Sequence, residues 1–461
     1  MYKDQVSTDV FIGDLVYVLG IFAVLMACAG VCILDLGLVR RKNAIDTLVQ
    51  KFVAGTCGAI GLAPVGYALW VVQIYQALGV RDPLKQAVVN YWIGGKALND
   101  YAQNLDPKVF PGADQFQIFM VLFVVFAFFV GVVIQSVGME RMRPGVLYVL
   151  AAAGGAIVTP VLYYLLWSGS SPLTQLGIHD FVGAMPVYMG MGGMTIAIAW
   201  RLKPRLGRFT GGEVGDLPGP TSIPLVALGV AVVLPCLIFF TLVAGYVVPG
   251  SGFYGISMTT TSFGMVTENL FAAIFGAGLV GAIMSYRLRN PYWAIAGPFV
   301  GYVCGTTFFD VARPWYMFLI GGGAPIATFL TVQLLARIRI DEDKVLPLIL
   351  GPAVYGAIVG GFATWGTKTG GYLGVDSGPH AFQGAEITPW GELFGIAVSV
   401  GFGFVVALVI CLPFEKAGRL RVTVDEERAG MDATYWQVDG PPADTGLDQI
   451  LSTQVEPEVR A

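Results

Sequence analysis

The chain has 461 residues, of which 55% are apolar and only 13% are charged. A soluble protein usually has about a quarter of its residues charged, so this composition excludes an ordinary soluble globular protein. The formal net charge of −4 and the lack of a basic stripe argue against binding of nucleic acid. We therefore expect a polytopic membrane protein.

Uncharged apolar runs of about 20 residues recur along the chain, and this length crosses a hydrocarbon core of about 30 Å. The predicted spans, in chain order, are residues 11–34, 51–78, 116–138, 146–168, 181–200, 222–247, 262–285, 292–309, 315–336, 345–365 and 390–412. The fold class predicted is thus an all-α polytopic membrane protein with eleven transmembrane helices. We expect the first helix to remain uncleaved. The polar and acidic residues 413–461 are expected to form a tail that is disordered past about residue 440.

The basic residues test these spans independently, because Lys and Arg gather in the cytoplasmic loops of membrane proteins. If the N-terminus lies outside the cell, 20 of the 27 Lys and Arg residues fall on one side of the membrane. That side holds Arg40, Arg41, Lys42, Lys51, Arg141, Arg143, Arg201, Lys203, Arg205, Arg208, Arg287, Arg289, Arg337, Arg339, Lys344, Lys416, Arg419, Arg421, Arg428 and Arg460. The asymmetry predicts an outer N-terminus and a cytoplasmic C-terminus in the plasma (inner) membrane.

No group of residues points to enzymatic or metal chemistry. The six cysteines lie in or against apolar runs and form no Cys-x-x-Cys pair, which favours buried small side chains over metal ligands. Glu268 and Asp310 stand alone near predicted span ends, and we interpret them as structural. We expect no catalytic residue, no metal and no cofactor.

Five segments resemble the ammonium transporter (Amt/Mep/Rh) family. In chain order they are "DLGLVRRKNA" (35–44), "APVGYALW" (63–70), "FVVFAFFVGVVIQSVGMER" (123–141), "HDFVGAMPVY" (179–188) and "RVTVDEERAGMD" (421–432). Together, in this order on eleven predicted spans, they are similar to the family along nearly the whole chain. The resemblance implies an inverted repeat of five helices plus an eleventh over residues 1–412, assembled as a homotrimer with one apolar pore in each protomer.

The resemblance also implies an outer vestibule where aromatic rings attract ammonium. A ring stabilises a cation that is losing its water by about 0.5–2 kcal/mol. By position, Trp167 matches the vestibule tryptophan, although a tryptophan at a helix end is also typical of the interfacial belt. Phe126 and Phe240 match the two stacked phenylalanines that gate the pore. The hydroxyl of many bacterial members falls near Ala244, so we expect its hydrogen bond to be absent.

Asp180 is the best anchor of the expected substrate site. A carboxylate near the mouth of a membrane span is costly unless it is paired or hydrogen-bonded, so such residues tend to be functional. Its place at the start of a helix also fits an N-cap that accepts bonds from backbone N–H groups. The resemblance implies that this carboxylate supports the recruitment site without contacting the substrate, and the two roles are compatible.

The pore is where the match to the family fails. Family members place two hydrogen-bonded histidines inside the pore, and the first would lie eight positions after Asp180, where this chain has Tyr188. The nearest match to the second, in "AVYGAIVGG", puts Tyr355 there, and the family's carboxylate shortly before it is not found. The chain has only His179, at the pore mouth, and His380, in the 366–389 loop. The sequence therefore predicts a pore without imidazole.

The loss of imidazole changes the chemistry that the pore can support. An imidazole, with a pKa near 6.5, can relay a proton between its two nitrogens. A tyrosine has a pKa of about 10, and burial disfavours its phenolate further, so Tyr188 and Tyr355 offer hydroxyls but store protons poorly. They could also narrow or plug the pore, and Pro186 is expected to kink the helix beside them. Two ordinary packing tyrosines are the alternative interpretation.

Two functions remain open at this point. The first is an ammonium or ammonia transporter or channel with a hydroxyl-lined pore. The second keeps the scaffold without transport, as a sensor or a structural subunit of a membrane complex, and a conduit for another small neutral molecule such as carbon dioxide is a further possibility. The tail motif suggests contacts between protomers, and the resemblance implies a docking site there for a PII-type signalling protein. Beyond Asp432, however, "ATYWQVDG" departs from the family pattern.

Overall fold

The computed structural model describes residues 8–106, 108–110, 112–209, 221–245, 247–249, 254–256, 261–369 and 385–438. His380 and the tail past residue 440 lie outside these ranges. The α-helices are α1 (Thr8–Leu38), α2 (Ala44–Leu62), α3 (Gly66–Ala77), α4 (Pro83–Tyr91), α5 (Lys96–Asn99), α6 (Ala113–Gly138), α7 (Pro144–Ala153), α8 (Thr159–Leu166), α9 (Gly190–Leu202), α10 (Ile223–Leu242), α11 (Phe263–Leu288), α12 (Tyr292–Gly305), α13 (Pro314–Arg337), α14 (Gly351–Ala363), α15 (Pro389–Lys416), α16 (Val424–Ala429) and α17 (Met431–Trp436).

Shorter elements complete the described chain. The π-helical turns are η3 (Gly154–Val158), η5 (Ala184–Met189) and η6 (Leu346–Leu350), and the 3₁₀ turns are η1 (Arg41–Asn43), η2 (Ala102–Asn104) and η4 (Thr174–Leu176). Strands β1 (Val247–Pro249) and β2 (Tyr254–Ile256) form one antiparallel pair, and β3 (Lys368–Thr369) and β4 (Ala385–Glu386) form another. Over the described residues, the protein is therefore a helical bundle with two short antiparallel strand pairs.

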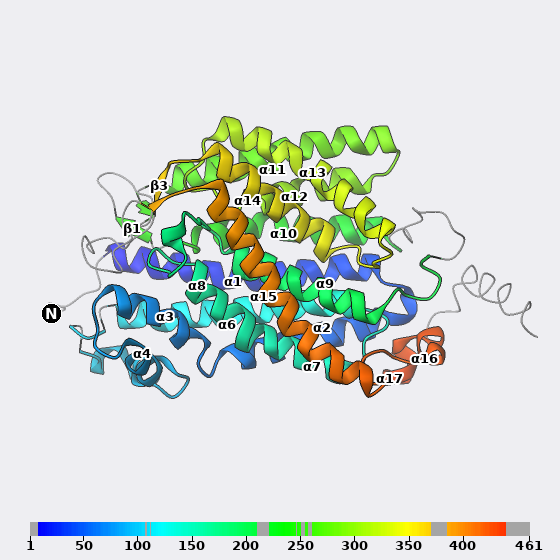
Figure 1. The fold of residues 1–461 in the computed structure, drawn as a ribbon, viewed down its shortest axis with the longest axis horizontal. Coiled ribbons are helices and arrows are strands. Elements are labelled where there is room, and N and C mark those ends of the chain that lie inside the picture. Colours follow the sequence, from blue (N-terminus) through cyan, green and yellow to red (C-terminus); the bar gives the residue numbers. More distant parts are fainter. Residues whose placement is uncertain are drawn as a thin grey trace, which may run out of the picture.

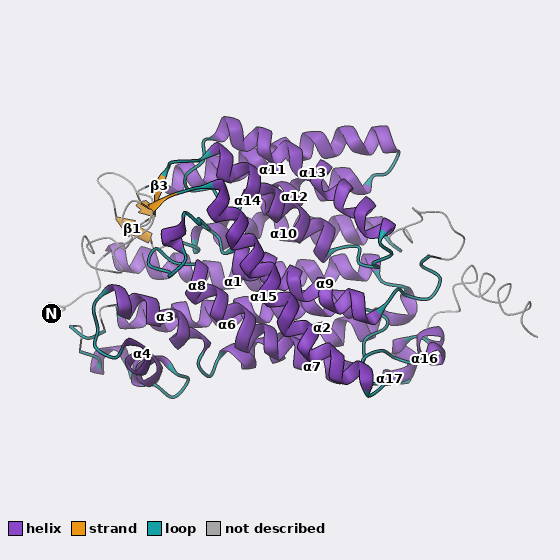
Figure 2. Ribbon diagram, viewed as in Figure 1, coloured by secondary structure: helices purple, strands orange, loops and turns teal. Residues whose placement is uncertain are grey.

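The long helices run roughly side by side along the long axis of the molecule (Figures 1 and 2). Strands β1 and β3 and helix α4 lie at one end, which we call the N-terminal face, and α16 and α17 lie at the other, the C-terminal face (Figure 1). Helix α15 slants across the bundle between them (Figure 1). Most long helices are apolar around much of their circumference, as expected where one side faces the bundle and the other faces lipid.

Eight described helices are long and apolar enough to cross a membrane, and the bent pair α2–α3 raises the number to as many as nine. The turn η5 with α9, and α12, also lie in the bundle, so the described arrangement is consistent with eleven crossings. The all-helical membrane fold predicted from the sequence is confirmed.

The second predicted span is broken. The sequence suggested one run over residues 51–78, but α2 ends at Leu62 and α3 begins at Gly66, with a bend of 40°. Pro64 causes the break because it has no N–H to continue the helix. Its carbonyl instead accepts a hydrogen bond from the N–H of Ile93 (3.0 Å). The Pro64 carbonyl, which the break leaves without a partner in its own helix, is thus satisfied by another segment of the protein, as a bilayer requires of lipid-embedded backbone.

Glycines allow close contact between helices α9 and α15. A Cβ atom on Gly403 of α15 would lie 1.9 Å from the carbonyl oxygen of Gly190, and one on Gly193 would lie 2.1 Å from that of Val400. Helices α9 and α15 therefore touch backbone to backbone, which is how helices associate where no hydrophobic force drives them together. This contact fixes the helix that follows η5.

The C-terminal face is closed by the tail. Asp432 of α17 accepts hydrogen bonds from the N–H groups of Ile45 (3.2 Å) and Asp46 (2.7 Å), which are at the start of α2. Nearby, Asp341 forms ion pairs with Arg205 (2.7 Å) and Arg141 (3.4 Å). Burial alone would raise the pKa of Asp341, but the two guanidinium groups hold it well below its usual range. The contacts of Asp432, together with a hydrogen bond from Trp436 Nε1 to Asp46 (3.0 Å), anchor residues up to Trp436 onto the bundle.

Candidate functional site

The carboxylate of Asp180 caps the turn that carries Tyr188. One oxygen accepts hydrogen bonds from the N–H groups of Gly183 (3.1 Å) and Ala184 (2.8 Å), and the other accepts one from Met185 (2.7 Å). Asp180 is only 5% exposed, and these backbone N–H groups provide the hydrogen bonds that a buried carboxylate needs. The side chain therefore acts as an N-cap, as its position in the sequence suggested. The cap fixes the direction in which η5 begins and with it the place of Tyr188.

Glu342 caps a second turn in the same way. Its oxygens accept hydrogen bonds from the N–H groups of Lys344 (3.1 Å), Val345 (2.8 Å) and Leu346 (2.6 Å) at the start of η6. Burial raises the pKa of Glu342 to about 7, although these backbone donors oppose the shift. The expectation that the carboxylate before the tenth span is missing was wrong. Glu342 is a carboxylate shortly before the predicted span 345–365, and the sequence pattern did not reveal that it caps the start of this span.

Trp167 lies inside an aromatic cluster at the end of α8. Its ring centroid is 5.0 Å from that of Tyr163 and 5.6 Å from that of Phe123, and its indole N–H donates to the carbonyl of Phe181 (3.1 Å). The ring is 5% exposed. Trp167 is thus packed in the interior of the protein rather than in a lipid-facing belt, and its indole N–H contacts the segment that the Asp180 carboxylate caps.

Phe126 and Phe240 are in contact, but edge to face rather than stacked as the resemblance implied. Their ring centroids are 4.9 Å apart at an interplanar angle of 77°, an edge-to-face contact. Both rings are buried, at 3% and 2% exposed. The two rings come from α6 and α10, so they join helices that are far apart in the sequence.

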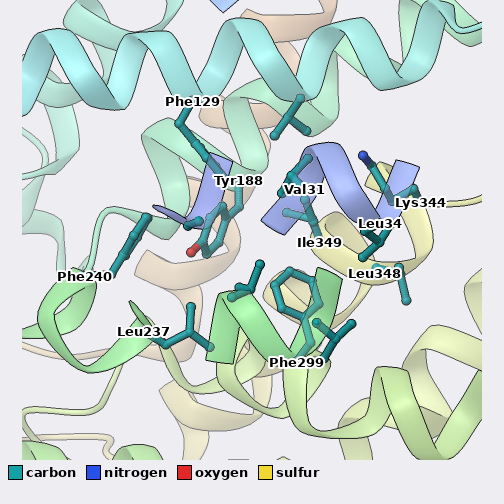
Figure 3. A pocket seen from close by; sticks show the side chains of 14 residues that line it. Val31, Leu34, Phe129, Tyr188, Leu237, Phe240, Phe299, Lys344, Leu348 and Ile349 are labelled. Carbon is teal, nitrogen blue, oxygen red and sulfur yellow. The ribbon is translucent and has the colours of Figure 1, made fainter. Parts of the chain in front are cut away.

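Beyond this ring pair lies an apolar cavity with an empty volume of about 610 Å³, its opening included. Figure 3 shows Tyr188 between the two phenylalanines Phe129 and Phe240 on one side and the rest of the cavity, with Lys344 at the far end, on the other. The lining residues are Ala27, Val31, Leu34, Phe129, Val133, Tyr188, Val230, Val233, Leu237, Phe240, Phe299, Lys344, Leu348 and Ile349. Among the described residues, only Tyr188 and Lys344 bring polar side-chain groups to this lining.

The hydroxyl of Tyr188 belongs to a small hydroxyl chain. It is hydrogen-bonded to the hydroxyl of Tyr302 on α12, and Thr241 Oγ1 lies 3.2 Å from the same Tyr302 oxygen. Tyr302 and Thr241 are fully buried. Sequence analysis did not single out Tyr302, because a tyrosine in an apolar span gives no signal of its partner. A chain of neutral hydroxyls can hold a small polar molecule but exchanges protons poorly at neutral pH.

Tyr355 is not among the residues that line the cavity. Its hydroxyl lies against Gly323 of α13, where a Cβ atom would come within 1.9 Å of it. The position eight residues after Glu342, which corresponds to Tyr188 in the first capped turn, is Leu350. The neighbouring Ile349 does line the cavity. The structure therefore brings one predicted tyrosine to the cavity and leaves the other between helices.

The one described histidine also lies outside the cavity. The imidazole Nε2 of His179 is 2.9 Å from Asp310, and its backbone N–H donates to Glu392 (2.7 Å). Asp310, read from the sequence as an isolated carboxylate, has this partner. Within the described ranges, no group of three or more His, Cys, Asp or Glu side chains could hold a metal ion.

Comparisons with known proteins agree with this geometry. A family model described as "Ammonium Transporter Family" matches residues 15–439. The chain belongs to the ammonium transporter family. It is 27% identical to "Ammonium transporter Amt2" of Haloferax mediterranei, over 94% of this chain and 92% of that protein. Ammonium transport is therefore the activity of the family to which this chain belongs.

Solved structures share the fold of this ammonium transporter family member. A "Sensor Amt Protein" matches with a TM-score of 0.73 at 19% identity, over 93% of this chain and 98% of that one. Mep2 of Saccharomyces cerevisiae matches with a TM-score of 0.67 at 16% identity, over 92% of each chain. The family match includes α16 and α17, so the docked part of the tail is part of the family architecture.

Proposed function

We propose that the protein carries ammonium nitrogen across the plasma membrane as neutral ammonia, through a conduit in each protomer of a homotrimer. The proposed path runs from the vestibule at Trp167, past the ring pair of Phe126 and Phe240, to Tyr188 and the apolar cavity. We place the C-terminal face in the cytoplasm, because the basic loops predicted to be cytoplasmic lie on the side of α16 and α17. The tail is then available to a PII-type regulator.

The observation that carries this proposal is the lining of the cavity. An ammonium ion that enters an apolar space must give up its hydration shell. This desolvation costs several kcal/mol unless fixed polar partners replace the water. Tyr188 offers a hydroxyl, and the one histidine in the described part of the chain, His179, does not line the cavity. Ammonia is neutral and needs only a hydrogen bond, so the lining favours the neutral molecule. The proton left behind by ammonium then stays on the entry side.

Vesicles that contain the purified protein test the proposal. After an ammonium pulse, entry of ammonia raises the internal pH as the molecule takes up a proton, whereas entry of ammonium carries current. We expect faster internal alkalinisation than in protein-free vesicles and no current on a supported membrane. A current that scales with ammonium concentration would show that the ion itself crosses.

A second candidate function has its own support. The ring contact between Phe126 and Phe240 stands at one end of the proposed path, and the ion pair of Lys344 with Asp35 stands at the other. A closed conduit favours a sensor or a structural subunit that binds ammonium without passing it on. Vesicles that respond no faster than protein-free ones, together with a stoichiometric partner in purification from native membranes, would favour this function. A pulse of carbon dioxide in the same vesicles tests a conduit for another neutral molecule.

A further inference from the structure

A buried polar cluster lies at the end of the cavity farthest from Phe240. Asp35 of α1, Lys51 of α2, Ser136 of α6 and Lys344 before η6 meet there, each at most 5% exposed. Both oxygens of Asp35 lie 2.5 Å from Lys344 Nζ, and Lys51 Nζ forms an ion pair with the same carboxylate. Ser136 Oγ lies 2.5 Å from Lys344 Nζ and 2.9 Å from Lys51 Nζ. Two ammonium groups therefore share one carboxylate and one hydroxyl.

The two lysines are not equivalent. Lys51 is fully buried, and its Nζ also donates to the carbonyl of Val132 (3.1 Å), so it has three acceptors on fixed helices. Lys344 lines the cavity, and Figure 3 shows its side chain at the cavity end opposite Phe240. The side chain of Lys344 thus stands between the apolar space and the carboxylate of Asp35. Removing Lys51 would not open Asp35 to the cavity, whereas removing Lys344 would.

The acceptors have the chemistry of an ammonium site. A carboxylate and a hydroxyl held about 2.5–3 Å from a tetrahedral –NH₃⁺ group form charge-assisted hydrogen bonds, and free ammonium presents the same donors as the lysine head group. The nearby carboxylate of Glu342 is occupied by three backbone N–H groups, so Asp35 remains the acceptor for the lysines. An isolated carboxylate in such a place would be very unfavourable, and both lysines compensate the charge of Asp35.

We propose that Asp35 and Ser136 form a site for a primary ammonium group, that Lys344 is its built-in occupant, and that Lys344 thereby closes this end of the conduit. The ligand class is ammonium or a short primary ammonium ion. The binding part of this inference stands by itself, and the closing part rests on the proposed function. The lysine acts as a tethered copy of the substrate that competes with it.

The binding test uses the full chain in detergent with Lys344→Met, which leaves Asp35 and Lys51 as a one-to-one ion pair. Melting temperature is measured against ammonium chloride at constant ionic strength, with sodium chloride as the balancing salt. We expect saturable stabilisation of Lys344→Met by ammonium, with half-saturation at a concentration about tenfold lower than in the unchanged protein, equivalent to about 1.4 kcal/mol. Methylammonium should act likewise, and tetramethylammonium, which has no N–H donor, should not.

Two variants make the result specific. Lys51→Met is the matched control, because it removes an equally buried lysine without opening Asp35 to the cavity, and it should show no gain. Asp35→Asn combined with Lys344→Met should lose the response. Lys344→Gln keeps a polar head group without charge. If the methionine variant does not yield monodisperse protein, the titration is repeated with this glutamine variant. Equal responses in the unchanged protein and in the Lys344 variant would overturn the site.

Flux in vesicles separates the two parts of the inference. If Lys344 closes the conduit, Lys344→Met raises the rate of internal alkalinisation at least several-fold over the unchanged protein. Binding without any flux in either protein would leave the ammonium site standing and remove the proposed transport. Unchanged flux in a Lys344→Met protein that binds no additional ammonium would leave transport standing and remove this inference.

Discussion

Removal of the Asp180 carboxylate tests whether the capped turn holds the conduit in shape. In Asp180→Ala, the N–H groups of Gly183, Ala184 and Met185 lose acceptors at 3.1, 2.8 and 2.7 Å. Each buried donor left without a partner costs about 1–3 kcal/mol. The expected loss of stability is therefore at least about 3 kcal/mol, which is large for a single substitution.

A graded pair of variants makes the reasoning quantitative. In Asp180→Asn, the amide oxygen can still accept from Gly183 and Ala184, but the NH₂ group faces the N–H of Met185, so the loss should lie between those of alanine and the unchanged protein. The exposed Asp425→Asn on α16 is the control for loss of one carboxylate. Thermal unfolding of the detergent-purified proteins, monitored by tryptophan fluorescence, ranks the stabilities of these variants and of the unchanged protein. An alanine variant that melts within a degree of the Asp425 control would refute the capping argument.

Three further predictions concern Tyr188, Asp432 and Lys344. Tyr188→Phe should slow ammonia entry about two- to tenfold, because one hydrogen bond is worth about 0.5–1.5 kcal/mol, while Tyr355→Phe, away from the cavity, should leave the vesicle assay unchanged; equal effects would contradict the assignment. Asp432→Ala should free the tail and speed limited proteolysis after α15, because it loses the acceptor of two N–H groups of α2, and an unchanged digestion pattern would count against this. Burial lowers the pKa of Lys344 to about 8, with Asp35 opposing the shift and Lys51 adding to it. Lys344 is therefore charged and bound to Asp35 below pH 8 and loses its charge above it, so flux at constant free ammonia should rise between pH 7 and 9 in the unchanged protein and stay flat in Lys344→Met.

Much of the fold could be predicted from the sequence, because the bilayer imposes a simple rule on chain composition. Apolar runs of sufficient length mark the helices, and their ends fell within a few residues of those in the structure. The break between Leu62 and Gly66 was missed, since hydropathy stays high through it and only Pro64 signals it. The ends of α9 and α12 also differ from the predicted spans, as these helices are short and packed inside the bundle.

The site was predicted less completely. The cap at Asp180 and the pair of Phe126 and Phe240 could be placed because local sequence resembles the family there. The second capped turn could not, because Glu342 stands among other acidic residues and the alignment shifted to Tyr355. The cluster of Asp35 and Lys344 joins positions 309 residues apart, and their spacing carries no signal. The only available sign was that charged side chains lie in or beside apolar spans, which is costly and therefore informative.

The contact between α17 and the start of α2 has a consequence for biogenesis. Asp432 is made 386 residues after Asp46, whose backbone it caps. During synthesis the backbone N–H groups in the first turn of α2 lack this acceptor until nearly the entire polypeptide has left the ribosome. A chain truncated before α17 would thus have its early helices inserted but would lack the Asp432 acceptor at the start of α2. Such a product exposes this end of α2 to cellular proteases.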